Sequence, residues 1–143
     1  MLPTIRPIAV ALFAALLAVS CGGLAAKGDA EAAVATFHEM LDAERYADMY
    51  EAADDAFKNV ASRGQFVQAL EAVHRKMGAV RSAAQTQFFS EDRVGTDAGS
   101  YIRFVYDTEF AEGRATETFS WRVSDKKIRL YYYNINSPIL VTR

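Results

Sequence analysis

The stretch GAVRSAAQTQF, residues 78–88, separates a helical half of the chain from a strand-forming half. Before Gly78, apolar side chains recur every three or four residues, which is the spacing of one buried face on a helix. After Gly78 the spacing becomes two, which is the period of a strand. This order predicts an α+β fold, with the helices packed on one side of a sheet. The strand period first appears in Val80, Ser82, Ala84, Thr86 and Phe88.

Three helices are expected before Gly78. Asp29 can cap the first, the second starts near Ala43 or Glu44, and Ser62 can cap the third. Gly78 suits the left-handed conformation that often follows a helix. The expected buried stripes are Val34, Phe37 and Leu41; Tyr46, Tyr50, Ala53, Phe57 and Val60; and Phe66, Leu70, Val73 and Met77.

Four strands are expected after Gly78. Short connections containing glycine or polar residues join them, which favours a curved, mostly antiparallel sheet. The strands are expected at about 79–88, 101–110, 115–123 and 128–135, separated by turn residues at 91–99, 112–113 and 124–126 and ended by Pro138.

The first 20 residues have the arrangement of an export signal. Arg6 is their only charged side chain, and an unbroken apolar run extends from Ile8 to Val19. This run is shorter than the roughly 20 residues that a helix needs to cross a bilayer, and a basic end followed by a short apolar run is typical of a cleaved signal. The sequence LAVSC at 17–21 resembles a bacterial lipobox, whose cysteine is lipidated and becomes the first residue of the mature protein.

Cys21 is the only cysteine, so no intramolecular disulfide can form and lipidation would give this residue a role. Cleavage of an ordinary signal after Ala25 is the alternative. Gly22 follows the cysteine, and resemblance to lipoproteins of two-membrane bacteria then favours the outer membrane, facing the periplasm. The expected organisation is a lipoprotein signal peptide at 1–20, a short flexible tether at 21–28 and a single α+β domain at 29–143.

The charge of the mature chain gives no sign of nucleic-acid binding. Removing residues 1–20 takes away only Arg6, which leaves 15 basic and 18 acidic side chains and a net charge of −3. The densest basic group is Lys126, Lys127 and Arg129, and two of these lie in an expected turn. We therefore expect no nucleic-acid partner, and no motif in the sequence predicts a cofactor.

Several motifs follow one another along the mature chain. They are Tyr46 and Phe57 in an aromatic-rich helix, then GAVRS at 78–82, Tyr101, YDTEF at 106–110, ET at 117–118 and YNI at 133–135. Together they resemble the bacterial family catalogued as domain of unknown function 4019, over nearly all of the mature chain. The resemblance implies a small exported or lipid-anchored domain with a cone similar to nuclear transport factor 2-like or cystatin-like folds. It brings no catalytic residues with it.

The pattern HEMLD at 38–42 resembles the metalloprotease helix, in which two imidazoles four residues apart bind zinc. Asp42 stands where the second imidazole is needed, so no metal site is expected. We interpret His38 as a solvated neighbour of the stripe that contains Phe37. His74 is interpreted as an ordinary histidine on a helix surface, because no nucleophile lies near it in the sequence.

Glu117 is the most informative polar residue of the strand half. It is in phase with Phe119 and Trp121, so burial of that face would turn its carboxylate inward. A buried carboxylate needs a partner, which Arg103 or a tyrosine hydroxyl can supply. A candidate ligand pocket then combines Glu117, Arg103, Tyr106 and Trp121. The alternative is that this face lies on the outside of the sheet, where Glu117 is solvated.

Residues 131–133 are three tyrosines, which places aromatic side chains on both faces of the last strand. Such aromatic, partly polar surfaces are enriched in protein interfaces, and Asp107 and Glu109 are expected to form an exposed acidic row beside them. We therefore expect a lipoprotein anchored to the bilayer through Cys21, whose non-catalytic domain binds an envelope protein, or a second copy of itself, through a sheet face. The alternative is an exported small-molecule-binding or enzymatic cone that uses Glu117 with tyrosines.

Overall fold

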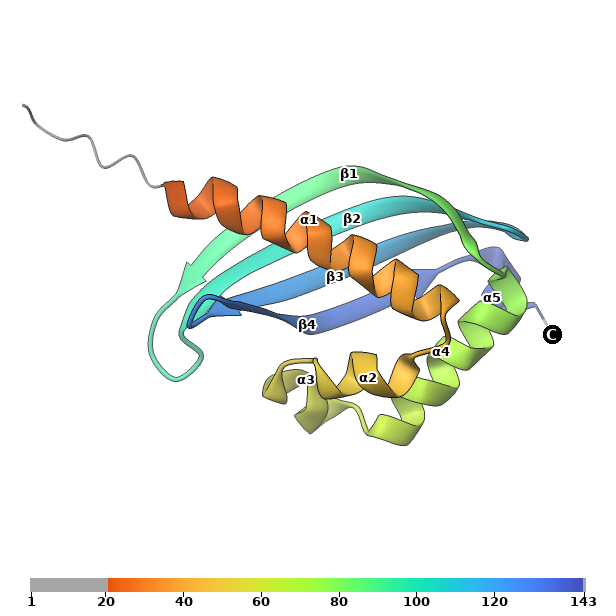
Figure 1. The fold of residues 1–143 in the computed structure, drawn as a ribbon, viewed down its shortest axis with the longest axis horizontal. Coiled ribbons are helices and arrows are strands. Elements are labelled where there is room, and N and C mark those ends of the chain that lie inside the picture. Colours follow the sequence, from red (N-terminus) through yellow and green to blue (C-terminus); the bar gives the residue numbers. More distant parts are fainter. Residues whose placement is uncertain (1–20, 143) are drawn as a thin grey trace, which may run out of the picture.

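Residues 21–142 are described by a computed structural model and form five helices and four strands (Figure 1). The expected signal peptide at 1–20 lies outside the described residues. The α+β class is confirmed, while five helices replace the three that the sequence predicted. The elements are α1 (Cys21–Asp42), α2 (Tyr46–Glu51), α3 (Asp55–Val60), α4 (Arg63–Met77), β1 (Val80–Arg93), β2 (Gly99–Phe110), β3 (Gly113–Ser124), β4 (Lys127–Asn136) and α5 (Pro138–Val141).

α1 begins at Cys21 rather than at Asp29, so the prediction of a flexible tether over 21–28 is wrong. Alanine has the highest helix propensity, and the charged side chains of Lys27 and Glu31 pair across one helical turn, which supports the helix in this part of the chain. The helix therefore leads from Cys21 into the domain without a flexible link. Its buried stripe contains Ala30, Val34, Phe37 and Leu41.

The second expected helix is broken into α2 and α3 at Asp54. The side chain of Asp54 accepts a hydrogen bond from the N–H of Ala56 at 3.0 Å and caps α3. The backbone N–H of Asp54 donates to the carbonyl of Leu130 on β4 at 2.9 Å. The break thus brings α3 against β4, and it leaves Val60, which the sequence placed in the buried stripe, exposed at the end of α3.

α4 agrees with the sequence at both ends. Ser62 Oγ accepts from the N–H of Gln65 at 3.3 Å, and Gln65 Oε1 accepts from the N–H of Ser62 at 3.1 Å, which is a complete capping box. The helix stops before Gly78, whose φ of 73° is costly for residues with a Cβ atom. The predicted stripe of Phe66, Leu70, Val73 and Met77 is buried.

The strands form one antiparallel sheet in the order β1-β2-β3-β4, so neighbours in sequence are neighbours in space. β1 continues to Arg93, beyond Phe88 where the sequence placed the end of the strand. Two irregularities interrupt its pairing with β2, so that Arg81 and Thr86 have no residue directly opposite them in the register. Such bulges increase the local twist of a sheet.

α1 crosses one face of the sheet, over β3 and β4 (Figure 1). We term this face the inner face and the opposite face the outer face. β2 alternates between them, with Arg103, Asp107 and Glu109 exposed on the outer face. No helix within residues 21–142 is both long enough and apolar enough to span a membrane. The buried inner residues of β2 are Ile102, Phe104, Tyr106, Thr108 and Phe110.

Candidate functional site

Glu117 lies on the inner face of β3, at the centre of the interface between the sheet and α1. Its side chain is 0% exposed. Register places it opposite Tyr106 on β2 and Ile135 on β4, both of which also belong to the apolar interior. The structure therefore answers the question that the sequence left open, because the face that carries Glu117 is the buried one.

Three side chains from three different elements bind the Glu117 carboxylate. His38 Nε2 on α1 lies 2.7 Å from Oε2, and Thr108 Oγ1 on β2 donates to the same oxygen at 2.5 Å. Tyr133 on β4 donates its hydroxyl to Oε1 at 2.7 Å. Both carboxylate oxygens thus have partners within the protein. We term these four residues the Glu117 network.

The electrostatics of the network follow from its burial. An ionised carboxylate only accepts hydrogen bonds, so His38 donates from Nε2 when Glu117 carries its charge. Burial, together with the neighbouring carboxylate of Glu117 and the hydrogen bond to it, holds the pKa of Tyr133 well above its ordinary value of 10.0. The Tyr133 hydroxyl therefore keeps its proton and remains a donor. Because Glu117 has no exposed surface, its contacts join α1 to the sheet and leave no side-chain atom facing solvent.

The prediction that His38 is a solvated neighbour of the Phe37 stripe is wrong, because His38 is buried. Its ring stands edge-on to Phe119, with centroids 5.8 Å apart. The signal was present in the sequence, since His38 follows Val34 by four residues and precedes Leu41 by three. The spacing places His38 on the buried face of α1, and the polarity of its ring was the reason to expect it in solvent.

The structure separates the residues of the predicted ligand pocket. Tyr106 and Trp121 share the inner face with Glu117 and are buried against Phe119, with Trp121 stacked on that ring at 6.0 Å. Arg103 lies on the outer face, where its Nε donates to Ser120 Oγ at 3.2 Å. The pairing of Arg103 with Glu117 is therefore wrong, because the two residues point to opposite sides of the sheet.

Trp121 borders a small apolar hollow between α1, α2 and the end of the sheet. The hollow has a volume of about 230 Å³. The indole Nε1 of Trp121 is buried and has no hydrogen-bond partner among the described residues. Neither Glu117 nor Arg103 lines this hollow, whose main side chains are Phe37, Met40, Met49, Trp121 and Leu130.

On the outer face, aromatic side chains surround Arg103. One hollow of about 290 Å³ is lined by Phe89, Arg103, Ser120 and Tyr131, and an adjoining hollow of about 270 Å³ adds Tyr132. Phe89 is 56% exposed and Tyr132 is 47% exposed, which is unusual for large apolar side chains in a small domain. We term these five residues the aromatic cleft.

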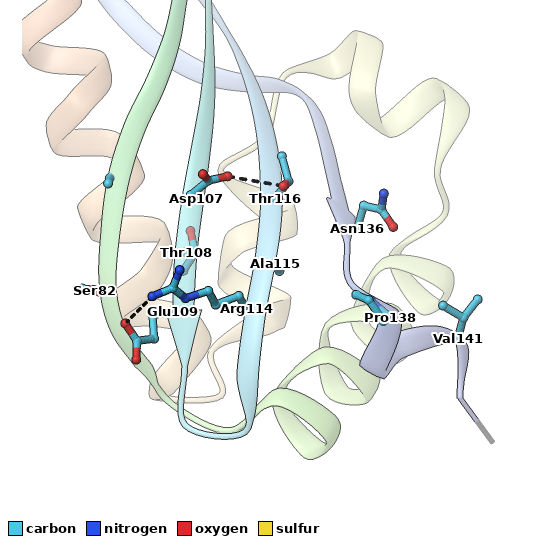
Figure 2. A pocket seen from close by; sticks show the side chains of 11 residues that line it. Ser82, Asp107, Thr108, Glu109, Arg114, Ala115, Thr116, Asn136, Pro138 and Val141 are labelled. Atoms are coloured by element: carbon cyan, nitrogen blue, oxygen red, sulfur yellow. Dashed lines mark hydrogen bonds and ion pairs between the residues drawn. The ribbon is translucent and has the colours of Figure 1, made fainter.

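The other end of the outer face is polar. A groove of about 800 Å³ runs beside α5 and is bordered by Pro138 (Figure 2). On its floor, Thr116 donates to Asp107 at 3.4 Å, and Arg114 lies 3.9 Å from the carboxylate of Glu109. The predicted exposed acidic row is thus confirmed, and each of its carboxylates contacts a residue of β3.

Potential metal-ligating side chains are scattered over residues 21–142. No group of three or more His, Cys, Asp and Glu side chains in this part of the chain could hold a metal ion. In the HEMLD pattern, the His38 ring is bound to Glu117, and Asp42 accepts the backbone N–H of Val80 at 3.0 Å. His74 is half-buried, with Nδ1 3.6 Å from a carboxylate oxygen of Glu44. His38, Asp42 and His74 thus bind three different partners and do not converge on one site.

Comparison with known proteins identifies the family but no activity. The chain matches no curated protein sequence. A family model described as a protein of unknown function (DUF4019) matches residues 33–133, a segment that contains the whole Glu117 network. The likeness to nuclear transport factor 2-like cones stays a prediction. Because the matched segment covers well over half of the sequence, this chain belongs to the DUF4019 family.

Proposed function

We propose that this protein is a bacterial envelope lipoprotein, anchored to the membrane through Cys21, whose non-catalytic domain binds another envelope protein through the outer face of its sheet. The anchor rests on the lone cysteine directly behind a short apolar run. Acyl chains contribute about 0.8 kcal/mol for each buried methylene, so two or three of them hold a protein durably on a bilayer. Since α1 begins at Cys21, the helix would hold the domain next to the membrane surface.

The aromatic cleft is the observation that supports binding. Tyrosine, phenylalanine and arginine are enriched in protein interfaces, and here they line two adjoining hollows whose lining, within residues 21–142, includes no helix residue. One guanidinium nitrogen of Arg103 bonds to Ser120, and the guanidinium group holds further N–H donors. A partner that presents a carboxylate beside an apolar side chain would fit both parts of the cleft.

The geometry of the interior favours a binding domain over an enzyme. An acid or base must come within hydrogen-bond distance of the group on which it acts. Glu117 has no exposed surface, and both of its oxygens are already bound by residues of the protein. We therefore assign the Glu117 network a role in stability and place the function on the outer face.

The anchor is tested by the intact mass of the protein extracted from membranes of its host. We expect a chain that starts at Cys21 and carries acyl groups, and we expect Cys21→Ser to abolish the modification and the membrane association. An unmodified chain that starts near Ala26 in the soluble fraction would overturn the anchor. The binding proposal would still stand, because it depends on a different part of the molecule.

The binding face is tested by photo-crosslinking in living cells. A photoreactive amino acid at Tyr132 should crosslink one envelope protein, while the same group at Val60 on α3, which is 83% exposed against 47% for Tyr132, should not. Arg103→Glu should remove the crosslink from Tyr132. Arg75→Glu reverses an exposed charge on α4 and should leave it unchanged. Equal yields at Tyr132 and Val60, or a product that survives Arg103→Glu, would overturn the proposed face.

A further inference from the structure

β1 is the longest strand of the sheet, and within residues 21–142 no strand pairs with one of its two edges. It spans 14 residues and pairs with β2 on the other edge, because it lies at the end of the strand order. Figure 1 shows it at the side of the sheet away from α2 and α3, with its first residues following directly from the end of α4. At about 3.3 Å per residue, the free edge is roughly 45 Å long. It presents unpaired backbone N–H and C=O groups that another strand can bind.

The opposite edge of the sheet is occupied. There, α3 packs against β4, and the N–H of Asp54 donates to the carbonyl of Leu130 at 2.9 Å. Within residues 21–142 no helix packs along the free edge of β1, where only the first N–H, that of Val80, is bound, by Asp42 at 3.0 Å. Residues 80–93 contain no proline, glycine or lysine. Proline and lysine are common devices that prevent an edge from pairing. β1 therefore lacks these two devices over all 14 of its residues.

Exposed aromatic side chains lie on both faces of this edge strand. Phe88, on the inner face, is 40% exposed, and Phe89, on the outer face, is 56% exposed. The first half of the same strand carries small side chains, including Ala83 and Ala84. If a second β1 strand paired with this edge in the opposite direction, its phenylalanines would lie beside the alanines of the first strand.

We infer that the free edge of β1 binds β1 of a second copy of this chain, antiparallel and around a two-fold axis, so that the two sheets become one. Symmetry requires that inner residues meet inner residues and outer residues meet outer residues. The pairing with β2 places Gln85 and Phe88 on the inner face, and Ala84 and Phe89 on the outer face.

One register satisfies these faces and also pairs opposite charges. It sets Ala84 against Phe89 of the second copy, and Gln85 against Phe88. The same register sets Arg81 against Asp92, and each of these pairs occurs twice in the dimer because of the two-fold axis. Arg81 is exposed and has no ion-pair partner within residues 21–142, while Asp92 accepts only a hydrogen bond from Ser100 at 2.6 Å. Both charges are thus free to meet across the new edge.

The arrangement is compatible with the proposed anchor and with the proposed binding face. A two-fold axis perpendicular to the joined sheet keeps both copies of α1 on the same face. Both membrane attachments would then emerge from one side of the dimer. The outer face of β4, with Tyr132, stays open in each copy. The dimer and the binding face share only Phe89, which belongs to the aromatic cleft and also lies on β1; Arg103, Ser120, Tyr131 and Tyr132 are on other strands.

The test is the mass of the full chain, purified in a mild detergent whose contribution is subtracted, by light scattering from about 1 to 100 µM. We expect the mass of two chains. Arg81→Glu places two carboxylates opposite each other at both symmetric positions, and we expect the dissociation constant of the dimer to rise about tenfold or more. The combination of Arg81→Glu with Asp92→Arg restores opposite charges and should restore the dimer.

Two control variants separate the loss of the Arg81–Asp92 pair from a general effect of charge and from changes in the aromatic cleft. Lys126→Glu makes the same change of charge in the turn between β3 and β4, and it should leave the dimer unchanged. Tyr132→Ser alters the aromatic cleft at the far side of the sheet and should also leave the dimer intact, even where it abolishes capture of an envelope partner. A monomeric mass at about 100 µM, or a double charge reversal that fails to restore what Arg81→Glu removes, would overturn the inference.

Discussion

His38 and Glu117 are 79 residues apart in the sequence, yet His38 Nε2 lies 2.7 Å from Glu117 Oε2 in the interior. The contact joins the first helix of the domain to the third strand of the sheet. Thr108 and Tyr133 bind the same carboxylate, so one side chain collects hydrogen bonds from α1, β2 and β4. A polar group in such a position is costly unless every partner is present.

Glu117→Gln should therefore destabilise the protein. The amide replaces an acceptor oxygen by a donor NH₂ group, so at least one of the three partners is left facing another donor. We expect a loss of about 1–3 kcal/mol in the free energy of unfolding. Glu109→Gln makes the same change at an exposed site on β2 and should change the free energy of unfolding by less than about 0.5 kcal/mol. Equal losses for the two variants, measured by denaturant unfolding, would contradict the structural role of the network.

The coupling between His38 and Glu117 can be measured directly. In a double-mutant cycle with His38→Ala and Glu117→Gln, we expect a coupling free energy of about 0.5–3 kcal/mol, because both residues belong to one hydrogen-bonded network. His74→Ala in place of His38→Ala supplies the control, since His74 is half-buried on α4 and pairs with Glu44. Additive effects of His38→Ala and Glu117→Gln would show that the contact contributes nothing to stability.

Tyr133 makes the stability of the protein sensitive to alkaline pH. Because its pKa is raised in the folded state, the folded protein holds the proton at pH values where the unfolded chain has released it. The contribution of the protonated Tyr133 hydroxyl to the free energy of unfolding is complete below pH 10, the ordinary pKa of tyrosine. This contribution is lost as the pH rises above that value. Tyr133→Phe should therefore lose stability less steeply than the wild type above pH 10. The pKa of Tyr106 is raised by burial and by the charge of Glu31, without the hydrogen bond to Glu117 that Tyr133 makes. Tyr106→Phe should therefore change the pH dependence less than Tyr133→Phe does in denaturant unfolding at several pH values. The same pH dependence for Tyr133→Phe and the wild type would contradict the prediction.

The sequence predicted the features that depend on nearby residues. The capping box of Ser62 and the end of α4 at Gly78 are set within one or two turns of helix, and both were recognisable. The break at Asp54 was not, because its backbone N–H bonds to Leu130, far along the chain. Whether Glu117 is buried depends on which face of the sheet α1 covers, and β3 alone does not contain that information. The clear alternation of β2, carried across the hairpin to β3, would have supplied it.

The contact between α3 and β4 depends on Asp54, which is buried and caps α3. Its Oδ1 atom also lies 3.5 Å from Arg122. Asp54→Ala should therefore remove a helix cap and leave the half-buried guanidinium without its carboxylate, at a cost of about 1–3 kcal/mol. Asp55→Ala, one residue on and exposed, should cost less than about 0.5 kcal/mol. If Asp54→Ala and Asp55→Ala lost the same stability in thermal unfolding, the helix cap and the contact with Arg122 would contribute no more than an ordinary exposed residue.

Gly78 and Gly64 should respond to the same substitution in opposite directions. At Gly78, φ is 73°, and an added Cβ atom would lie 2.8 Å from the Cβ atom of Ala111, so both the backbone and the packing oppose alanine. We expect Gly78→Ala to destabilise the protein by about 1–3 kcal/mol. Gly64 lies inside α4, where an added Cβ atom meets nothing within 4 Å. Gly64→Ala should stabilise the protein by about 0.4–1 kcal/mol, because alanine narrows the unfolded ensemble and favours the helix. A Gly78→Ala variant as stable as the wild type in denaturant unfolding would show that neither the backbone conformation nor the packing at this position requires glycine.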